Sequence, residues 1–113
     1  MSVSFNGFNM NILTFRCIEE IPEGTPVKVS KANSVEPCFD GDVFHGIAVD
    51  GDEKYVSVQL KGIVTVRYSS TAPTVGLNKL GANVSGGIKV TETGREYLVL
   101  SVDEAQSKVT FLM

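Results

Sequence analysis

Tyr55-Val-Ser-Val-Gln-Leu-Lys-Gly-Ile-Val-Thr-Val-Arg-Tyr68 alternates between two kinds of side chain along its whole length. Its even-numbered positions are apolar or glycine, and its odd-numbered positions are mostly polar, which predicts a half-buried β-strand. The stretch is about twice as long as an ordinary strand, and Gly62 lies near its middle on the apolar face. We therefore expect a bend or bulge at Gly62, where one long strand turns a corner between two halves of a sheet. Such a strand commonly closes a small barrel or sandwich.

Size and composition fit one folded domain. The chain has 113 residues, a formal net charge of −3 and an isoelectric point near 5.0. A chain of this length can bury an ordinary core without a metal or a disulfide. Its three arginines are far apart in sequence, which argues against a broad nucleic-acid surface. The first residues lack the basic start of a signal peptide, and no later stretch is long enough to span a membrane.

The rest of the chain predicts short strands separated by turns. We expect strands over 10–18, 27–31, 43–49, 82–85, 88–91, 97–102 and 108–112, with the long strand at 55–68. We expect irregular structure at 19–26 and 32–42, and the longest connection at 69–82. Helical spacing is absent beyond one turn. The prediction is an all-β fold, a small antiparallel barrel or sandwich with very little helix. Residues 1–20 would form an N-terminal arm and the first strand, and 21–113 a single β-barrel domain.

Residue types that could carry catalysis or bind metal are few. His45 is the only histidine, and Cys38 lies close to it in sequence, but no third residue is placed to orient such a pair. Asp40-Gly-Asp42 and Asp50-Gly-Asp52-Glu53 could offer oxygen ligands to calcium, yet Asp-Gly is also a common turn former. We expect no catalytic residue, cofactor or metal site. Without a secretory signal, Cys17 and Cys38 are expected to be partly buried free thiols rather than a disulfide.

Two kinds of binding protein fit this pattern. An oligonucleotide-binding barrel would use a basic groove and stacking aromatics. Tyr55, Lys61, Arg67 and Tyr68 give a thin version of that groove in an acidic chain. The other kind is a protein that oligomerises or docks on a larger surface through open strand edges and an uncharged aromatic N-terminal segment.

Several short segments carry a resemblance to a known family. They are Gly24-Thr-Pro-Val27, Gly46-Ile-Ala48, Gly62-Ile-Val64, the stretch from Gly76 to Val84, and Tyr97-Leu-Val-Leu-Ser-Val-Asp103. In these segments the chain resembles the small capsid cement, or head-decoration, proteins of tailed bacteriophages and prophages, many of which are filed as a phage domain of unknown function. The resemblance covers residues 24–112 and rests on glycines and β-branched residues.

The resemblance implies a non-enzymatic structural virion protein. Such a protein is compact and β-barrel-like, often trimeric, and bridges major capsid subunits on the outer face of an assembled head. Its partners would be further copies of itself and the major capsid protein, with neither nucleic acid nor membrane. It would pass from the cytoplasm of the bacterial host to the virion surface. The candidate protein-binding residues are Phe5 and Phe8 in the N-terminal arm, with Arg16, Tyr55, Arg67 and Tyr68 at the rim of the contact. The alternative function is a small β-barrel module that binds nucleic acid or another ligand.

Overall fold

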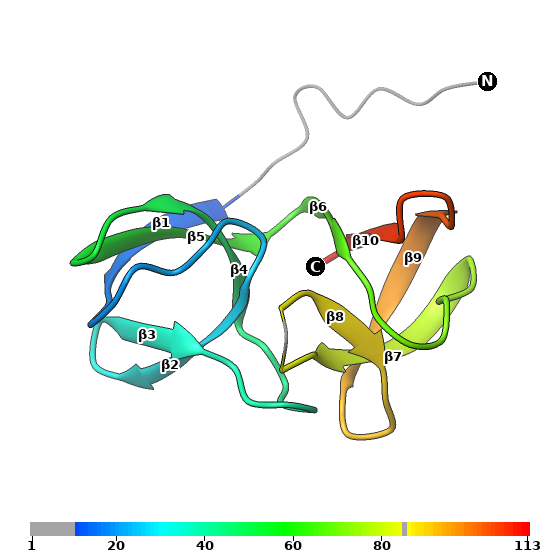
Figure 1. Cartoon of the computed structure of the whole chain (residues 1–113), viewed down its shortest axis with the longest axis horizontal. Coiled ribbons are helices and arrows are strands. Elements are labelled where there is room, and N and C mark those ends of the chain that lie inside the picture. Colours follow the sequence, from blue (N-terminus) through cyan, green and yellow to red (C-terminus); the bar gives the residue numbers. More distant parts are fainter. Residues whose placement is uncertain (1–10, 85) are drawn as a thin grey trace.

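A computed structural model describes residues 11–84 and 86–113, which form ten β-strands and no helix (Figure 1). The expected all-β fold is confirmed. The first five strands are β1 (Asn11–Arg16), β2 (Pro26–Lys31), β3 (Ser34–Pro37), β4 (Gly46–Gly51) and β5 (Tyr55–Lys61). The last five are β6 (Ile63–Arg67), β7 (Gly76–Ala82), β8 (Ile88–Val90), β9 (Arg95–Asp103) and β10 (Lys108–Leu112). Among these residues there is no helix long and apolar enough to cross a membrane.

The strands form two units that lie side by side (Figure 1). The first unit is a closed barrel in the order β1-β3-β2-β4-β5, and the second is a sheet in the order β6-β10-β9-β7-β8. A parallel bridge between Tyr68 and Ile88 also joins the end of β6 to β8. We call residues 11–61 the first unit and residues 62–113 the second unit.

Gly62 is the corner expected in the long patterned segment. The strand stops at Lys61 in the barrel and resumes at Ile63 in the second sheet. Between them Gly62 has a φ of 107°, a backbone conformation that glycine adopts far more easily than residues with a Cβ atom. The alternation therefore continues through the corner, but its two halves belong to different sheets.

The two units repeat one strand plan. If β6 to β10 are matched in order with β1 to β5, each strand of the second unit pairs with the strands that correspond to the neighbours of its match in the first unit. In both units the pairing between the first and the third strand is parallel. The registers also agree. Thr14 pairs with Ser57 in the first unit, and Thr65 pairs with Thr110 in the second. We call residues that occupy the same place in the two pairing schemes counterparts.

An irregularity in strand pairing also occurs at the same place in both units. In the first unit the pairing of β4 with β5 skips Val49, and in the second unit the pairing of β9 with β10 skips Leu100, its counterpart. Bulges are specific local features of a strand pair, so an interruption at the same place in both units indicates a shared plan. The sequences also match where the first strands begin, with Ile12-Leu-Thr-Phe-Arg16 beside Ile63-Val-Thr-Val-Arg67.

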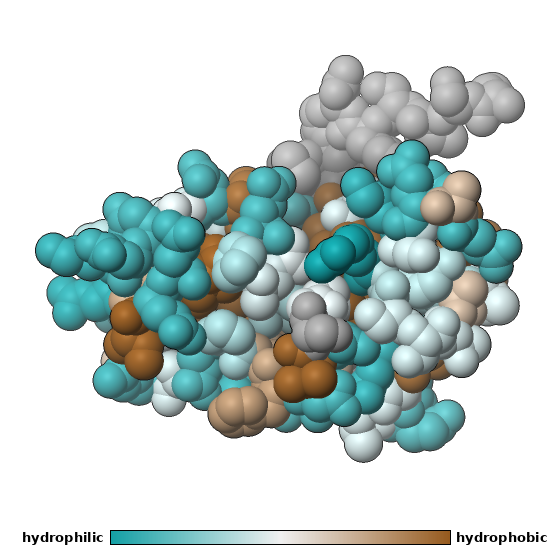
Figure 2. Space-filling view, in the orientation of Figure 1, coloured by the Kyte–Doolittle hydropathy of each residue, from teal (hydrophilic) through white to brown (hydrophobic). Residues whose placement is uncertain are grey.

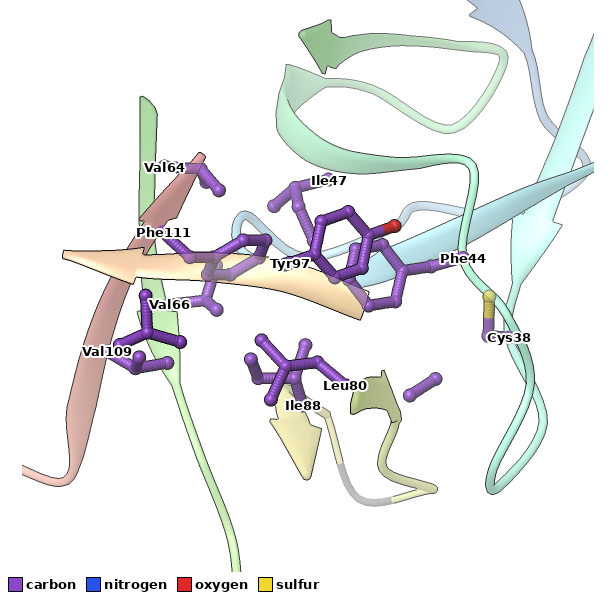
Figure 3. Packing of buried hydrophobic residues seen from close by; sticks show 12 residues of the cluster. Cys38, Phe44, Ile47, Val64, Val66, Leu80, Ile88, Tyr97, Val109 and Phe111 are labelled. Carbon is purple, nitrogen blue, oxygen red and sulfur yellow. The ribbon is translucent and has the colours of Figure 1, made fainter. Parts of the chain in front are cut away.

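Each unit has its own core, but the second core borrows side chains from the first unit. The core of the first unit consists of Cys17, Ile21, Val27, Val35, Ala48, Val56 and Val58. The larger second core includes Cys38, Phe44 and Ile47 from the first unit. Phe44 stacks on Tyr97 with ring centroids 5.2 Å apart and meets the edge of Phe111 at 6.1 Å. Figure 3 shows Phe44 and Ile47 entering this cluster from the connection before β4 and from β4 itself.

Some predicted boundaries were wrong. The segment 32–42, expected to be irregular, contains β3, and the expected connection at 69–82 contains the whole of β7. The strand expected at 43–49 begins only at Gly46, because Phe44 turns away to fill the second core. The hairpins β4–β5 and β9–β10 are confirmed. β7 and β8 also pair as a hairpin, but the strand expected at 82–85 is wrong, because β7 ends at Ala82 and Asn83 and Val84 belong to the connection.

Candidate functional site

A cationic hollow lies beside the end of β1. Arg16 is the last residue of β1 and pairs with Tyr55 at the start of β5, so both side chains stand on the same outer face. The hollow has a volume of about 370 Å³. Its lining consists of Arg16, Cys17, Ile18, Lys31, Ser34, Lys54 and Tyr55. Thus two of the predicted rim residues, Arg16 and Tyr55, do come together.

The basic side chains of this hollow differ from the paired lysines elsewhere in the chain. The ion pairs in the part of the chain that the structure describes join Lys28 to Glu36 and Asp42, Lys79 to Glu92, and Lys89 to Asp40, and none of these involves the hollow. Tyr55 is 49% exposed and Ile18 is 86% exposed, so the cations are flanked by accessible apolar surface. Such a hollow can bind carboxylate or phosphate groups.

Carboxylates gather on the other side of Lys54. Glu20, Asp52 and Glu53 line a neighbouring hollow of about 350 Å³ together with Lys54. Backbone amides of Lys54 and Tyr55 donate to Asp52 Oδ1 over 2.8 and 2.9 Å, and these bonds lower the pKa of Asp52. Figure 2 shows hydrophilic residues over most of the end of the first unit in that view, with apolar residues in small separate groups. The first unit therefore carries a basic and an acidic surface next to each other.

Arg67, the counterpart of Arg16, lines a separate hollow. It has a volume of about 390 Å³ and is lined by residues 22–25, Thr65, Val66, Arg67, Gly86, Gly87 and Lys108. Lys108 is the pairing partner of Arg67 on β10. Tyr68 is only partly exposed and packs against the second core. The predicted rim residues are thus divided between two hollows, with Tyr68 in a largely structural position.

Phe5 and Phe8 lie outside the described residues, and their proposed part in binding stays a prediction.

Cys38 and His45, the nucleophile and base considered from the sequence, have structural contacts of their own. Cys38 is a free thiol in the second core, and burial, with a smaller effect of the Asp42 charge, raises its pKa to about 12. The thiol is therefore protonated at neutral pH, whereas a nucleophilic cysteine needs its thiolate. His45 Nδ1 accepts a hydrogen bond of 2.8 Å from the Val29 amide. Cys17 is also a free, buried thiol, and burial raises its pKa.

The aspartates of the two Asp-Gly-Asp turns bind protein groups. Asp42 accepts hydrogen bonds of 2.8 Å from Lys28 Nζ and from the Phe39 amide. Asp40 binds Lys89 Nζ at 2.7 Å and the Val84 amide at 3.1 Å. Within residues 11–84 and 86–113, no group of three or more His, Cys, Asp or Glu side chains is placed to hold a metal ion.

Sequence reasoning missed Lys31 and Lys54. They lie far from Arg16 in sequence and reach the same hollow only because β1 pairs with both β3 and β5. The repeated motifs Thr-Phe-Arg16 and Thr-Val-Arg67 mark the two arginines, but they give no signal for these lysines.

Comparisons with known proteins give no family for this chain. No family model matches the sequence, and no curated protein matches it significantly.

Proposed function

We propose that the chain is a non-enzymatic structural protein of a phage virion that self-associates and binds the outer surface of an assembled capsid. The observation that carries this proposal is the hollow at Arg16, Lys31 and Lys54, where cations without an ion pair among the described residues lie beside exposed apolar side chains. Charged groups flanked by an accessible aromatic ring are typical of a contact between proteins.

Two glycines of the resembling segments are required by packing or by backbone conformation. Gly46 pairs with Val27, so two of the resembling segments are neighbours in the barrel. A Cβ atom at Gly46 would collide with the Val58 side chain and the Gln59 carbonyl oxygen. Gly62 makes the corner between the units. These positions require glycine for reasons of packing and backbone conformation.

Capsid binding of this kind would act by mass action. A protein that binds only the assembled shell stabilises it by about 2.7 kcal/mol per site at a hundredfold excess over its dissociation constant. No chemical step is needed. The carboxylates of a capsid loop are the groups that the cations at Arg16, Lys31 and Lys54 would bind.

The experiment is co-sedimentation of the purified chain with expanded heads built from the major capsid protein of the same phage or prophage. We expect the chain to pellet with expanded heads. A triple variant, Arg16→Ala with Lys31→Ala and Lys54→Ala, should lose at least about tenfold in affinity, since even one contact of a charged group contributes about 1.5–3 kcal/mol. Lys79→Ala is the matched control, because Lys79 is an exposed lysine of the second unit paired with Glu92. Absence of the wild-type chain from the pellet would refute capsid binding.

The same cations also favour a second candidate function, binding of single-stranded nucleic acid. Tyr55 could stack on a base while Arg16, Lys31 and Lys54 contact phosphates. Fluorescence anisotropy with a labelled oligothymidylate tests it. Binding at low salt that weakens steeply as salt is added would support this function, and no binding at low salt would exclude it.

A further inference from the structure

A row of apolar side chains crosses the outer face of the second sheet. Leu77 pairs with Leu98, Leu98 with Leu112, and Leu112 with Ile63. We call these four residues the second-unit row. Val64, Tyr97, Val99 and Phe111, which adjoin Ile63, Leu98 and Leu112 along the strands, belong to the second core, so these three residues face outward, and Leu77 shares their face through its pairing with Leu98. Leu77 is 64% exposed and Leu98 is 41% exposed.

The counterpart row of the first unit is a packing surface. It consists of Pro26, Ile47, Gln59 and Ile12, which are joined by the same cross-strand pairs. Ile47 is only 2% exposed and belongs to the second core (Figure 3). Gln59 is 7% exposed, and its amide donates to the Ile63 carbonyl oxygen over 3.0 Å. Ile47 and Gln59, in the middle of this row, therefore pack against the second unit, while Ile12 at the end of the row is 45% exposed. In the second unit, Leu77 and Leu98 occupy the positions of Pro26 and Ile47 and stay accessible to solvent.

The first unit has an incompletely covered interior. Val64 and Leu80 of the second core are 7% and 0% exposed, but their counterparts, Leu13 and Val29, are 54% and 43% exposed. Leu13 pairs with Val58 and Val29 with Val35, and both partners are buried in the first core. Leu13 and Val29 thus stand on the interior side of the barrel wall and still reach solvent.

We propose that the second-unit row of one copy packs against the first unit of another copy, where Leu13 and Val29 are exposed. This contact would repeat between chains the packing that joins the two units within a chain. The proposal rests on the self-association part of the proposed function and names the two surfaces involved. Because the surfaces differ, the contact is head to tail, and successive copies either close into a ring or extend as a filament. A second copy is the occupant because contact of the same kind, Ile47 and Gln59 of one unit against the other unit, already joins the two units within each chain.

The contact between copies should be weaker than the one within the chain. The connection between β3 and β4, residues 38–45, supplies Phe44 to the second core, whereas the connection between β8 and β9, residues 91–94, is shorter and has no aromatic residue in its sequence. Fewer buried aromatic anchors mean lower affinity. We therefore expect the copies to dissociate from one another on dilution.

Sedimentation velocity of the full chain tests the proposal through two variants. Leu98→Glu alters the row and Leu13→Glu alters the opposite surface, and both residues are exposed in the monomer, so both variants should fold, as circular dichroism and thermal melting will check. Each should raise the dissociation constant at least about tenfold, because a buried contact would have to desolvate a carboxylate. Mixing the two variants should restore association but stop at two copies, since each variant keeps one intact surface. Val84→Glu, at a position 73% exposed on the second unit, is the control and should associate as the wild type does.

Every other outcome overturns the proposal in an identifiable way. If Leu13→Glu associates normally while Leu98→Glu does not, the rows of two copies pack on each other. If the wild type is monomeric at every concentration, something other than a second copy covers the row. Co-sedimentation of the Leu98→Glu variant with expanded heads separates the two proposals: binding by the monomeric variant would preserve the capsid function even if head-to-tail association failed.

Discussion

Removing the Phe44 ring should destabilise both units together. Phe44 is 1% exposed, comes from the first unit, and contacts Tyr97 and Phe111 of the second. Truncation of a buried phenylalanine to alanine typically costs 3–5 kcal/mol. Loss of the two ring contacts places Phe44→Ala in the upper part of that range, at about 4–5 kcal/mol. Natural domains have only about 5–15 kcal/mol of stability, so the variant should be near the limit of folding.

Urea denaturation followed by circular dichroism measures this loss. We expect the midpoint to fall while the slope of unfolding free energy against urea stays the same, because the same surface is exposed in both proteins. Phe39→Ala is the matched control. Its ring is 65% exposed and contacts Lys28 Nζ, 4.1 Å from the ring centroid, and its removal should cost less than about 1 kcal/mol.

Hydrogen exchange then shows whether the two units unfold as one. In Phe44→Ala, the amides of Val56 in the first core and Val109 in the second should lose protection by similar amounts. A loss below about 1 kcal/mol would refute the assignment of Phe44 as the side chain that seals the second core. A shallower urea slope, with protection lost only at Val109, would show instead that the units unfold separately.

Single residues at the corner, in an ion pair and in the two cores give three more tests. Gly62→Ala should destabilise the chain by about 1–3 kcal/mol, because alanine is strained at a φ of 107°. An unchanged urea midpoint would contradict this backbone conformation at the corner between the units. Hydrogen bonding to Lys28 lowers the pKa of Asp42, so the carboxylate stabilises the fold above its ordinary pKa and loses that effect as pH falls through the lowered value. Asp42→Asn should therefore be less stable than the wild type at pH 7, with the difference shrinking in acid; a constant difference in urea midpoint would argue against the ion pair. Finally, Cys38 of the second core should react with a thiol reagent more slowly than Cys17 of the first core, because Cys17 lines the hollow at Arg16, whereas burial raises the pKa of Cys38 to about 12; prompt labelling of Cys38 in the absence of denaturant would contradict its burial.

Alternation of apolar and polar residues predicted strands correctly where one face of the strand is exposed to solvent. Residues 55–68 and 108–112 alternate clearly, and their strands are placed correctly. Gly62 stands out in the sequence because a glycine on the apolar face of a strand typically marks a bulge or a tight bend. β7 was missed because its exposed face carries Leu77, so its pattern does not separate a buried side from a wet one.

The contacts between units could not be predicted from local pattern. In the sequence, Phe44 fits the alternating pattern of a strand, but its side chain packs in the core of the second unit. Gln59 looks like a solvent-facing residue of the long strand, and it is buried with its amide bonded to the carbonyl oxygens of Lys61 and Ile63. Of the candidate binding residues, Arg16 and Tyr55 come together by the pairing of β1 with β5, which also brings in Lys54, the neighbour of Tyr55. Lys31 joins them through Ser34, which pairs with both Lys31 and Arg16 where β3 meets β1.

The direction of the packing between the units has a consequence for synthesis on the ribosome. The half that emerges first carries Phe44 and Ile47, and the half that emerges last contains the space they fill. Domains tend to fold in the order in which they leave the ribosome, so the first barrel can present these side chains before β9 and β10 exist. The second unit would then fold around side chains that the first unit already presents. A truncated chain ending near Gly62 would leave Phe44 and Ile47 in contact with water.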